Sequence, residues 1–255
     1  MKGGKALAIP AGSRYPQHGS PFHTKYTRQT LAHNTLLING KGQIDKDPTR
    51  NANIFADEAT KHISYVAGEA HKAYGETVKR FDRHMVMLRP SVILIMDDLE
   101  FNEPSEVEWL LHGKEKFVLD ETKQSLLSKR NGEQMSVQFI SPIWMKFSQN
   151  DIWPLEPKTG YPMVTTSDPV NQYHFTGMTN NKVNHLRIAT VMIVNNKTKA
   201  ITKQFPDKDG ANIEITFENK STAKIKMQTG NQKTLMEITY SPISGSTEKM
   251  IINQK

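Results

Sequence analysis

The stretch HMVMLRPSVILIMDDLE, residues 84–100, decides the fold that this sequence predicts. Two apolar runs flank Arg89-Pro90-Ser91, a spacing typical of antiparallel strands joined by a tight turn. The second run, residues 92–96, is apolar at every position, so both faces of that strand should be buried. We therefore expect this strand to lie in the interior of a sheet and not at its edge.

Alternating segments recur along the rest of the chain. Two of them place three apolar side chains each on one face, namely Val107, Trp109 and Leu111, and Met135, Val137 and Phe139. Further strand patterns cover residues 185–194, 212–217, 223–228, 235–240 and 249–254. A period of two with turn signals at Asn131-Gly132, Asp209-Gly210 and Thr229-Gly230 predicts an antiparallel sandwich.

The predicted fold class is therefore all-β, a large antiparallel β-sandwich. A length of 255 residues accommodates one such domain, spanning residues 1–255. Past residue 200 the chain becomes rich in Lys and Asn and its strands are short. We expect about residues 200–255 to form a smaller terminal sheet layer.

The composition limits the classes of partner. The net charge is +7 and the isoelectric point about 9.4, which favours anionic partners. No Lys/Arg-rich run or zinc-finger spacing supports a nucleic acid, and acidic polysaccharide fits the dispersed positive charge at least as well. A solvated basic surface with no particular partner is the alternative. The chain has no cysteine, which excludes disulfides and thiolate chemistry and leaves its compartment open.

The N-terminal residues raise a question about the extent of the protein. No apolar run approaches the ~20 residues of a membrane helix, so we expect no membrane span. MKGGKALAIP, residues 1–10, lacks the apolar region and the cleavage site of a signal peptide. Its GKALAIP part is typical of a strand already under way, which predicts a fragment or a product without its upstream part.

Residues 141–172 break the alternation. They hold five prolines, two tryptophans and one tyrosine without a sustained period. Long loops of this kind in a compact domain are usually functional or mobile. Trp144, Trp153 and Tyr161 could stack on sugar rings, or they could pin the loop to the sheet.

The segment RYPQHGSPFHTKYTRQTLAHNTLLINGKGQ, residues 14–43, concentrates reactive side chains. It contains three of the nine histidines, two tyrosines and two arginines. Such a mixture suits proton abstraction next to a carboxylate, because one group neutralises the acid and another removes the proton. Neutral imidazoles also ligate zinc, although the spacing includes no helical His pair. Hydrogen bonding to loop backbone is the structural alternative for each of these residues.

The same segment resembles the C-terminal β-sandwich of the heparinase II/III-like family, which includes alginate and related uronic-acid lyases. The resemblance rests on GSPFH (19–23), Tyr26, Gln29-Thr30, Ala32-His33-Asn34 and NGKGQ (39–43). Downstream, YGETVKRFDRHMVMLRPSVILIMDDLE (74–100) is similar to a strand pair of that family. The resemblance is strong over residues 5–112 and diffuse beyond them.

Membership would imply a two-part enzyme, an α/α toroid followed by this sandwich, with the active cleft between them. Such enzymes cleave acidic polysaccharide by β-elimination, and the toroid supplies the Asn or His that neutralises the carboxylate and a Tyr that transfers protons. We therefore expect the N-terminal toroid to be missing and the isolated chain to be inactive. The resemblance also implies a periplasmic or secreted bacterial protein. A non-catalytic carbohydrate-binding or scaffold sandwich is the rival interpretation.

The resemblance carries site residues onto particular positions. We predict His23 and Tyr26 as catalytic residues, and Arg28, Asn34 and Tyr15 as substrate-binding residues.

In some members one zinc ion is held by an upstream His, an Asp and the His that corresponds to His33. The Asp position is Pro10 here, so either the metal is lost or His23 substitutes for the missing ligand. The metal prediction is therefore His33 with His23. His84 and His112 fall in or at the ends of predicted strands. His84 could face the cleft, or it could be a hydrogen-bonded histidine of the sandwich.

Overall fold

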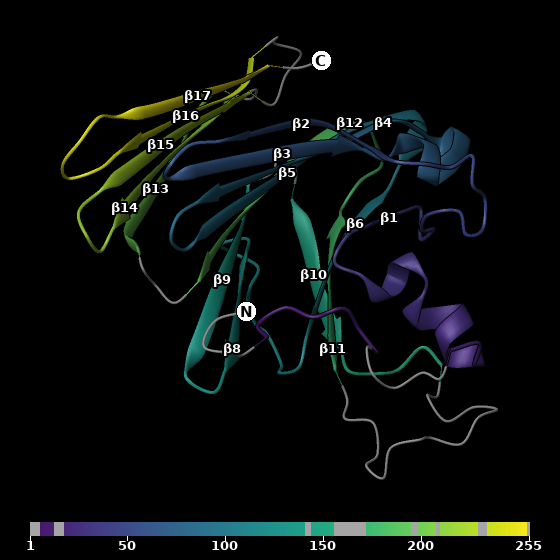
Figure 1. The fold of residues 1–255 in the computed structure, drawn as a ribbon. Coiled ribbons are helices and arrows are strands. Elements are labelled where there is room, and N and C mark those ends of the chain that lie inside the picture. The colour runs from purple at the N-terminus through teal and green to yellow at the C-terminus, as the bar shows by residue number, and fades with distance from the viewer. Residues whose placement is uncertain are drawn as a thin grey trace.

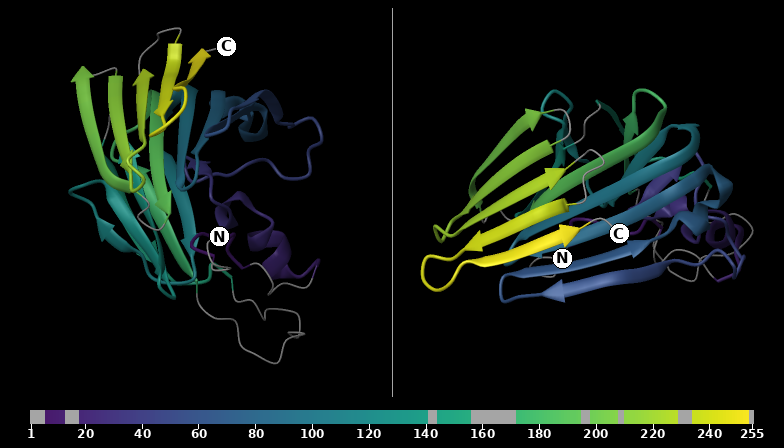
Figure 2. Two further views of the ribbon diagram at one scale, coloured as in Figure 1. Left: turned by 60° about the vertical axis from the view of Figure 1, so that its left-hand side comes forward. Right: turned by 90° about the horizontal axis from the view of Figure 1, so that it is seen from above.

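The computed structural model describes residues 6–12, 18–140, 144–155, 172–194, 198–207, 210–228 and 234–253. In these residues seventeen strands form three antiparallel sheets, stacked as layers in Figures 1 and 2. The predicted all-β antiparallel sandwich is thereby confirmed.

The central layer is an eight-stranded sheet in the order β2-β3-β4-β5-β12-β9-β8-β7. Its strands, taken in that order, are Asn53–Ala59, Ile63–Glu69, Val78–Leu88, Val92–Ser105, Val183–Val194, Glu133–Ile140, Ser125–Arg130 and Val118–Asp120. The predicted hairpin of residues 84–100 is the β4–β5 pair, and β5 lies in the interior of the sheet between β4 and β12.

Two outer layers cover this sheet. The four-stranded sheet has the order β1-β6-β11-β10, with bounds Leu36–Ile38, Val107–Gly113, Tyr173–Thr179 and Met145–Asn150. The five-stranded sheet runs from β13 to β17, with bounds Thr198–Asp207, Gly210–Phe217, Thr222–Gln228, Thr234–Ser241 and Glu248–Asn253. The latter consists of the residues expected to form a smaller terminal layer.

Two hydrophobic cores separate the layers, and β5 contributes to both because its side chains alternate. Val92, Leu94 and Met96 pack into the core under the five-stranded sheet. Ile93 and Ile95 pack against the other core, which the four-stranded sheet covers. The predicted faces of β6 and β9 also point into this second core, through Val107, Trp109, Leu111, Met135, Val137 and Phe139.

The N-terminal segment lies beside the four-stranded sheet, at the opposite end of the molecule from β13–β17 (Figures 1 and 2). It contains a π-helical turn, η1 (His23–Thr27), and a 3-10 turn, η2 (Thr30–Ala32), before β1. Another 3-10 segment, η3 (His71–Thr77), precedes β4. None of the helical segments described is long and apolar enough to cross a membrane.

Candidate functional site

The π-helical turn η1 is held by its own polar residues. The Ser20 hydroxyl accepts a hydrogen bond from the backbone N–H of His23 at 3.1 Å, and Thr24 Oγ1 donates to the Ser20 carbonyl at 3.0 Å. The N–H of Arg28 reaches the carbonyl of His23 at 3.1 Å, which is the i→i+5 bond of a π-turn. This turn directs Tyr26 inward, whereas Arg28 remains partly exposed.

Tyr26 belongs to a small aromatic cluster that attaches the segment to the sandwich. Its side chain is 1% exposed, and its ring lies 5.3 Å from Phe22 and 6.1 Å from Trp153. Trp153 also contacts Phe22 edge-on at 5.5 Å. Trp153 therefore packs its loop against the protein. Of the two predicted roles, sugar stacking and anchoring of the loop, the structure supports anchoring for this residue. Trp144 is 45% exposed, and Tyr161 lies outside the described residues.

A polar chain runs from this cluster toward β1. Tyr26 Oη lies 3.3 Å from Nδ1 of His174 on β11. His174 stands opposite His112 of β6 in the strand register, with the ring centroids 5.1 Å apart. His112 Nδ1 in turn lies 3.1 Å from Oδ1 of Asn34. Three segments distant in sequence thus meet below the Ala32-His33-Asn34 turn.

Burial sets the protonation of this chain. Desolvation raises the pKa of the Tyr26 hydroxyl far above its ordinary value, so the phenol stays protonated beside Nδ1 of His174. His112 is 1% exposed, and burial, followed by the neighbouring His174, lowers its pKa to about 3. Burial also lowers the pKa of His174. Both imidazoles are therefore neutral at physiological pH.

A polar groove lies next to this chain, on the surface. We call it the His33 groove. It has a volume of about 320 Å³ and is lined by Arg28, Gln29, Thr30, His33, Thr35, Gln43, Ile44 and Asp45. His33 is exposed in it. Arg28 forms an ion pair with Asp45, and this hydrogen bond is the largest cause that keeps the pKa of Asp45 low. The groove thus presents a cation, an imidazole and amide donors to solvent.

The structure brings together only part of the predicted site. Arg28 and His33 share the groove, and Asn34 follows directly after His33. His23 is half-buried instead, where its Nδ1 accepts the Gly19 N–H at 3.1 Å and its ring lies 4.8 Å from that of His18. Tyr15 lies outside the described residues. The catalytic and binding roles of all these residues stay predictions.

The predicted zinc site finds no support in the donor geometry. Across the described ranges, no group of three or more His, Cys, Asp or Glu side chains is placed to hold a metal ion. Asp45 shares the groove with His33, but its carboxylate is engaged by Arg28. Zinc ligation by His33 with His23 therefore stays a prediction.

Several residues of this region escaped the sequence analysis. His174, which contacts Tyr26, and Asp45, which engages Arg28, carried no local signal because their partners are remote or lie in an irregular loop. His84 faces the other side of the sheet, where it is 3% exposed and bonded to the Tyr65 hydroxyl at 2.9 Å. His84 is therefore a hydrogen-bonded histidine of the sandwich and does not face the groove.

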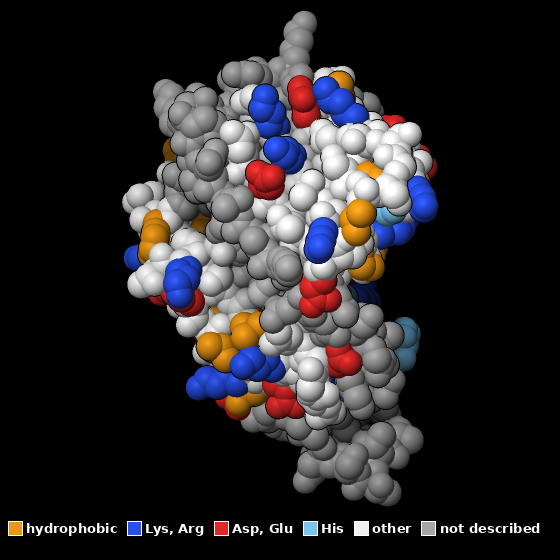
Figure 3. Space-filling model, turned by 90° about the vertical axis from the view of Figure 1, so that its left-hand side faces the viewer, with side chains coloured by type: hydrophobic (Ala, Val, Ile, Leu, Met, Phe, Trp, Pro, Cys, Tyr) orange, Lys and Arg blue, Asp and Glu red, His pale blue; other side chains and the backbone are white. Residues whose placement is uncertain are grey.

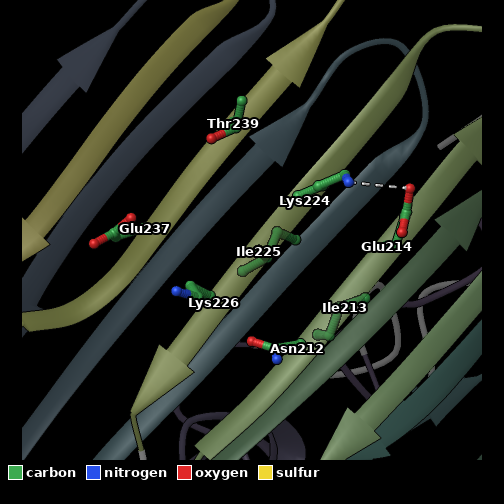
Figure 4. Close-up of a pocket in the computed structure, with 8 residues that line it drawn as sticks. All are labelled: Asn212, Ile213, Glu214, Lys224, Ile225, Lys226, Glu237 and Thr239. Carbon is green, nitrogen blue, oxygen red and sulfur yellow. Dashed lines mark ion pairs between the residues drawn. The ribbon is translucent and has the colours of Figure 1, made fainter.

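Another hollow, of about 330 Å³, lies on the outer face of the five-stranded sheet (Figure 4). Its walls are solvated side chains of neighbouring strands, such as Lys224, whose Nζ is 3.7 Å from Glu214 Oε1. On the face shown in Figure 3, Lys and Arg are interspersed with Asp and Glu. This hollow has no buried polar group comparable to His112, so we take the His33 groove as the candidate site.

The fold and the groove define a class, a layered antiparallel β-sandwich with a polar, partly cationic rim. Comparison with known proteins identifies the family. The family model described as Heparinase II/III-like, C-terminal, matches residues 2–228, and the chain therefore belongs to this family. A search of curated proteins finds no match.

Solved structures agree with this assignment at the level of the fold. A heparinase III, the BT4657 gene product, superposes with a TM-score of 0.63 at 18% identity, over 88% of this chain and 34% of that one. A heparan sulfate lyase HepC mutant from Pedobacter heparinus superposes with a TM-score of 0.59 at 13% identity, over 94% of this chain and 33% of that one. This chain thus spans about a third of the length of these structures.

Proposed function

We propose that this chain is the β-sandwich part of a polysaccharide lyase that cleaves uronate-containing anionic glycans by β-elimination. The observation that carries the proposal is the polar groove of Arg28 and His33 in a chain of the heparinase II/III-like family. The net charge of +7 agrees with an anionic substrate. A periplasmic or secreted location of the full-length bacterial protein belongs to the same proposal.

The reaction places defined demands on the site. A base removes the proton from the carbon that bears the carboxylate, the electron pair forms a carbon–carbon double bond, and the glycosidic carbon–oxygen bond breaks. The leaving oxygen receives a proton. Cations and N–H donors beside the carboxylate make the first step easier because they stabilise the negative charge that develops there. In this chain Arg28 and Asn34 are the groups that would supply such contacts.

The predicted catalytic pair differs in accessibility. His23 is half-buried, so part of its side chain is accessible to a bound ligand. Tyr26 transfers a proton only if its hydroxyl leaves His174 and the contact with Trp153 opens. We propose that the remaining catalytic groups come from an N-terminal toroid domain, which fits the solved relatives because this chain covers only 34% of one of them and 33% of another.

The rival function, a non-catalytic carbohydrate-binding module, is favoured by the closed state of Tyr26, which is 1% exposed. In that case the His33 groove binds the acidic glycan and nothing in the protein cleaves it. Both functions predict binding by the isolated chain, so binding alone does not separate them.

The test has two arms. The purified chain and a longer protein that includes the upstream toroid are each mixed with alginate, heparan sulfate and heparin, and the absorbance of the unsaturated product is followed. We expect the chain to bind one of these glycans without product and the longer protein to form product. Binding without product by both proteins supports the rival module. Failure of the chain to bind any acidic glycan contradicts both functions.

A further inference from the structure

The side chain of Asn34 has a fixed orientation, although it lies at the surface. Its Oδ1 is 2.9 Å from the backbone nitrogen of His112 and 3.1 Å from Nδ1 of the same residue. A backbone N–H can only donate, so the atom facing it must be the amide oxygen and not the amide nitrogen. His112 therefore determines which way the amide of Asn34 points.

The ring of His112 has two hydrogen-bonding neighbours, Oδ1 of Asn34 and the backbone of Leu31. Oδ1 of Asn34 can only accept, so the ring donates to Asn34 in the tautomer that carries its proton on Nδ1. Because the ring is 1% exposed and held at a fixed strand position, the donor does not compete with water.

The backbone of the turn is held from both sheets. The carbonyl of Thr35 accepts the Leu110 N–H of β6 at 2.9 Å. From the eight-stranded sheet, Arg83 Nη1 approaches the carbonyl of Asn34 at 3.5 Å. Asp97 holds this arginine through two contacts, at 2.6 and 3.0 Å. Asn34 thus lies at a junction of two rigid layers, which limits movement of its side chain.

The amide nitrogen is the part of the side chain that remains available. Within the described part of the chain, no protein acceptor is hydrogen-bonded to Nδ2 of Asn34, and the residue is exposed. It is the end of the amide that does not face His112, and Asn34 itself adjoins His33, which lines the groove. An N–H donor held in this way attracts a carboxylate and offers no acceptor in return.

We propose that Asn34 donates a hydrogen bond to the uronate carboxylate of the bound glycan and that His112 is the positioning residue that fixes this donor. This inference rests on the proposed function, because it takes the acidic glycan as the ligand of the groove. It assigns His112 a role through Asn34 and not through contact with the sugar.

The experiment compares variants that change one property at a time. Asn34→Asp keeps the acceptor for His112 but replaces the outward donor with a carboxylate oxygen. His112→Phe keeps an aromatic ring without the side-chain donor, and His112→Asn places an amide donor near the position of Nδ1. Asn181→Asp, at the exposed turn between β11 and β12, makes the same charge change away from the groove.

Each variant is titrated with oligosaccharides of alginate and heparan sulfate, and with the same oligosaccharides after reduction of their carboxyl groups. For acidic oligosaccharides we expect Asn34→Asp to weaken binding about 10-fold, since a charge-assisted hydrogen bond is lost. His112→Phe keeps the backbone N–H contact to Oδ1 and loses only the side-chain donor, so it should weaken binding less, by about fivefold. His112→Asn should restore affinity to within about threefold of the parent, and Asn181→Asp should stay near it. With carboxyl-reduced oligosaccharides, Asn34→Asp should match the parent.

Two results overturn the inference. The first is that Asn34→Asp binds acidic oligosaccharides as tightly as the parent, and the second is that it loses the same factor of affinity for the carboxyl-reduced ones. In either case the proposed function survives, because the parent chain still binds. A parent chain that binds no acidic oligosaccharide removes both proposals together. If circular dichroism shows that His112→Phe does not fold, the affinities of Asn34→Asp and His112→Asn, each relative to the parent, decide whether the inference holds.

Discussion

Asp82 and Asp98 face each other directly across strands β4 and β5, as two carboxylates in one register pair. Asp98 is 1% exposed and has two arginines, Arg80 and Arg187, and the imidazole of His185 within 3.1 Å. Asp82 lies between this pair partner and Glu69 of β3. Like charges opposite each other destabilise a sheet, so the two acids cannot both be ionised without cost.

The first prediction concerns Asp82. Burial, followed by the charge of Asp98, raises the pKa of Asp82 to about 6. The folded state then binds this proton more tightly than the unfolded state, whose carboxyl titrates near ~4. Ionised Asp82 therefore destabilises the folded protein. This destabilisation is absent below about pH 4, grows as the pH rises, and is complete above about pH 6. Asp82→Asn should stabilise the protein at pH 7 by roughly 1–2 kcal/mol, after allowance for partial exposure.

Urea unfolding between pH 4 and pH 7 measures this difference. The gain from Asp82→Asn should grow with pH over that range. Asp57→Asn, an exposed acid of the edge strand β2, should show no such growth. A gain that is constant with pH would contradict the argument from Asp98.

The second prediction concerns Arg187, which is 1% exposed and donates from Nη1 to the Gln228 carbonyl at 2.9 Å. Its Nη2 lies 3.1 Å from Asp98. Removal of Arg187 takes away one of the two arginines beside the buried carboxylate of Asp98, and Arg80 remains. Arg187→Met should therefore lower the free energy of unfolding by about 3 kcal/mol, the lower end for a broken buried ion pair. The double variant with Asp98→Asn should cost less than the two single variants added together, as a thermodynamic cycle would show.

The third prediction concerns Glu248, at the start of β17. It accepts hydrogen bonds from Thr60 and from the N–H and ring of His62, at 3.1 and 2.6 Å for the latter two. Burial opposes ionisation of Glu248, but these bonds outweigh it and lower its pKa to about 2. Ionised Glu248 thus contributes to the free energy of unfolding at pH values above its pKa in the unfolded state, which is near ~4.4. This contribution is lost as the pH falls toward 2.

Glu248→Gln should therefore destabilise the protein by roughly 1–2 kcal/mol at pH 7, and the difference from the parent should shrink below about pH 4. Thermal unfolding at several pH values provides the measurement. Glu58→Gln, at an exposed position of the edge strand β2, serves as a matched control. Equal destabilisation at pH 7 and pH 3 would show that the ionised form is not responsible.

The fourth prediction separates the roles of Arg28 and Asp45. Their ion pair occupies part of the arginine that an anionic glycan would contact. Arg28→Ala should weaken binding of acidic glycan severalfold, and Asp45→Asn should strengthen it, both less at high salt because the contacts are exposed. Binding titrations at two salt concentrations test this, with Lys182→Ala at a remote turn as the charge control. Changes of the same sign in both groove variants would exclude the groove as the binding surface.

Much of the fold could be predicted because it is encoded locally. The β4–β5 hairpin and the inward faces of β6 and β9 follow from apolar alternation, since successive side chains of a strand point to opposite faces. The turn at Asn131-Gly132 has positive φ at both residues, 48° and 83°, as its sequence predicts. The stacking of the three sheets could not be predicted as well from the sequence, because it depends on which sheet faces pack against each other.

The candidate site shows the same division. Arg28 and His33 could be predicted together because they lie five residues apart in one segment and share one groove. The burial of Tyr26 could not be predicted, since its partner His174 is 148 residues away.

By itself, the sequence determined the strands, the antiparallel class and the short segment that carries the polar residues of the groove. Only the tertiary structure decided which of these residues face solvent and which are enclosed. It also decided that His112, 78 residues beyond Asn34, orients that amide. The physical reason is that alternation is a property of neighbours along the chain, whereas burial and hydrogen-bond partners depend on distant strands that packing brings together.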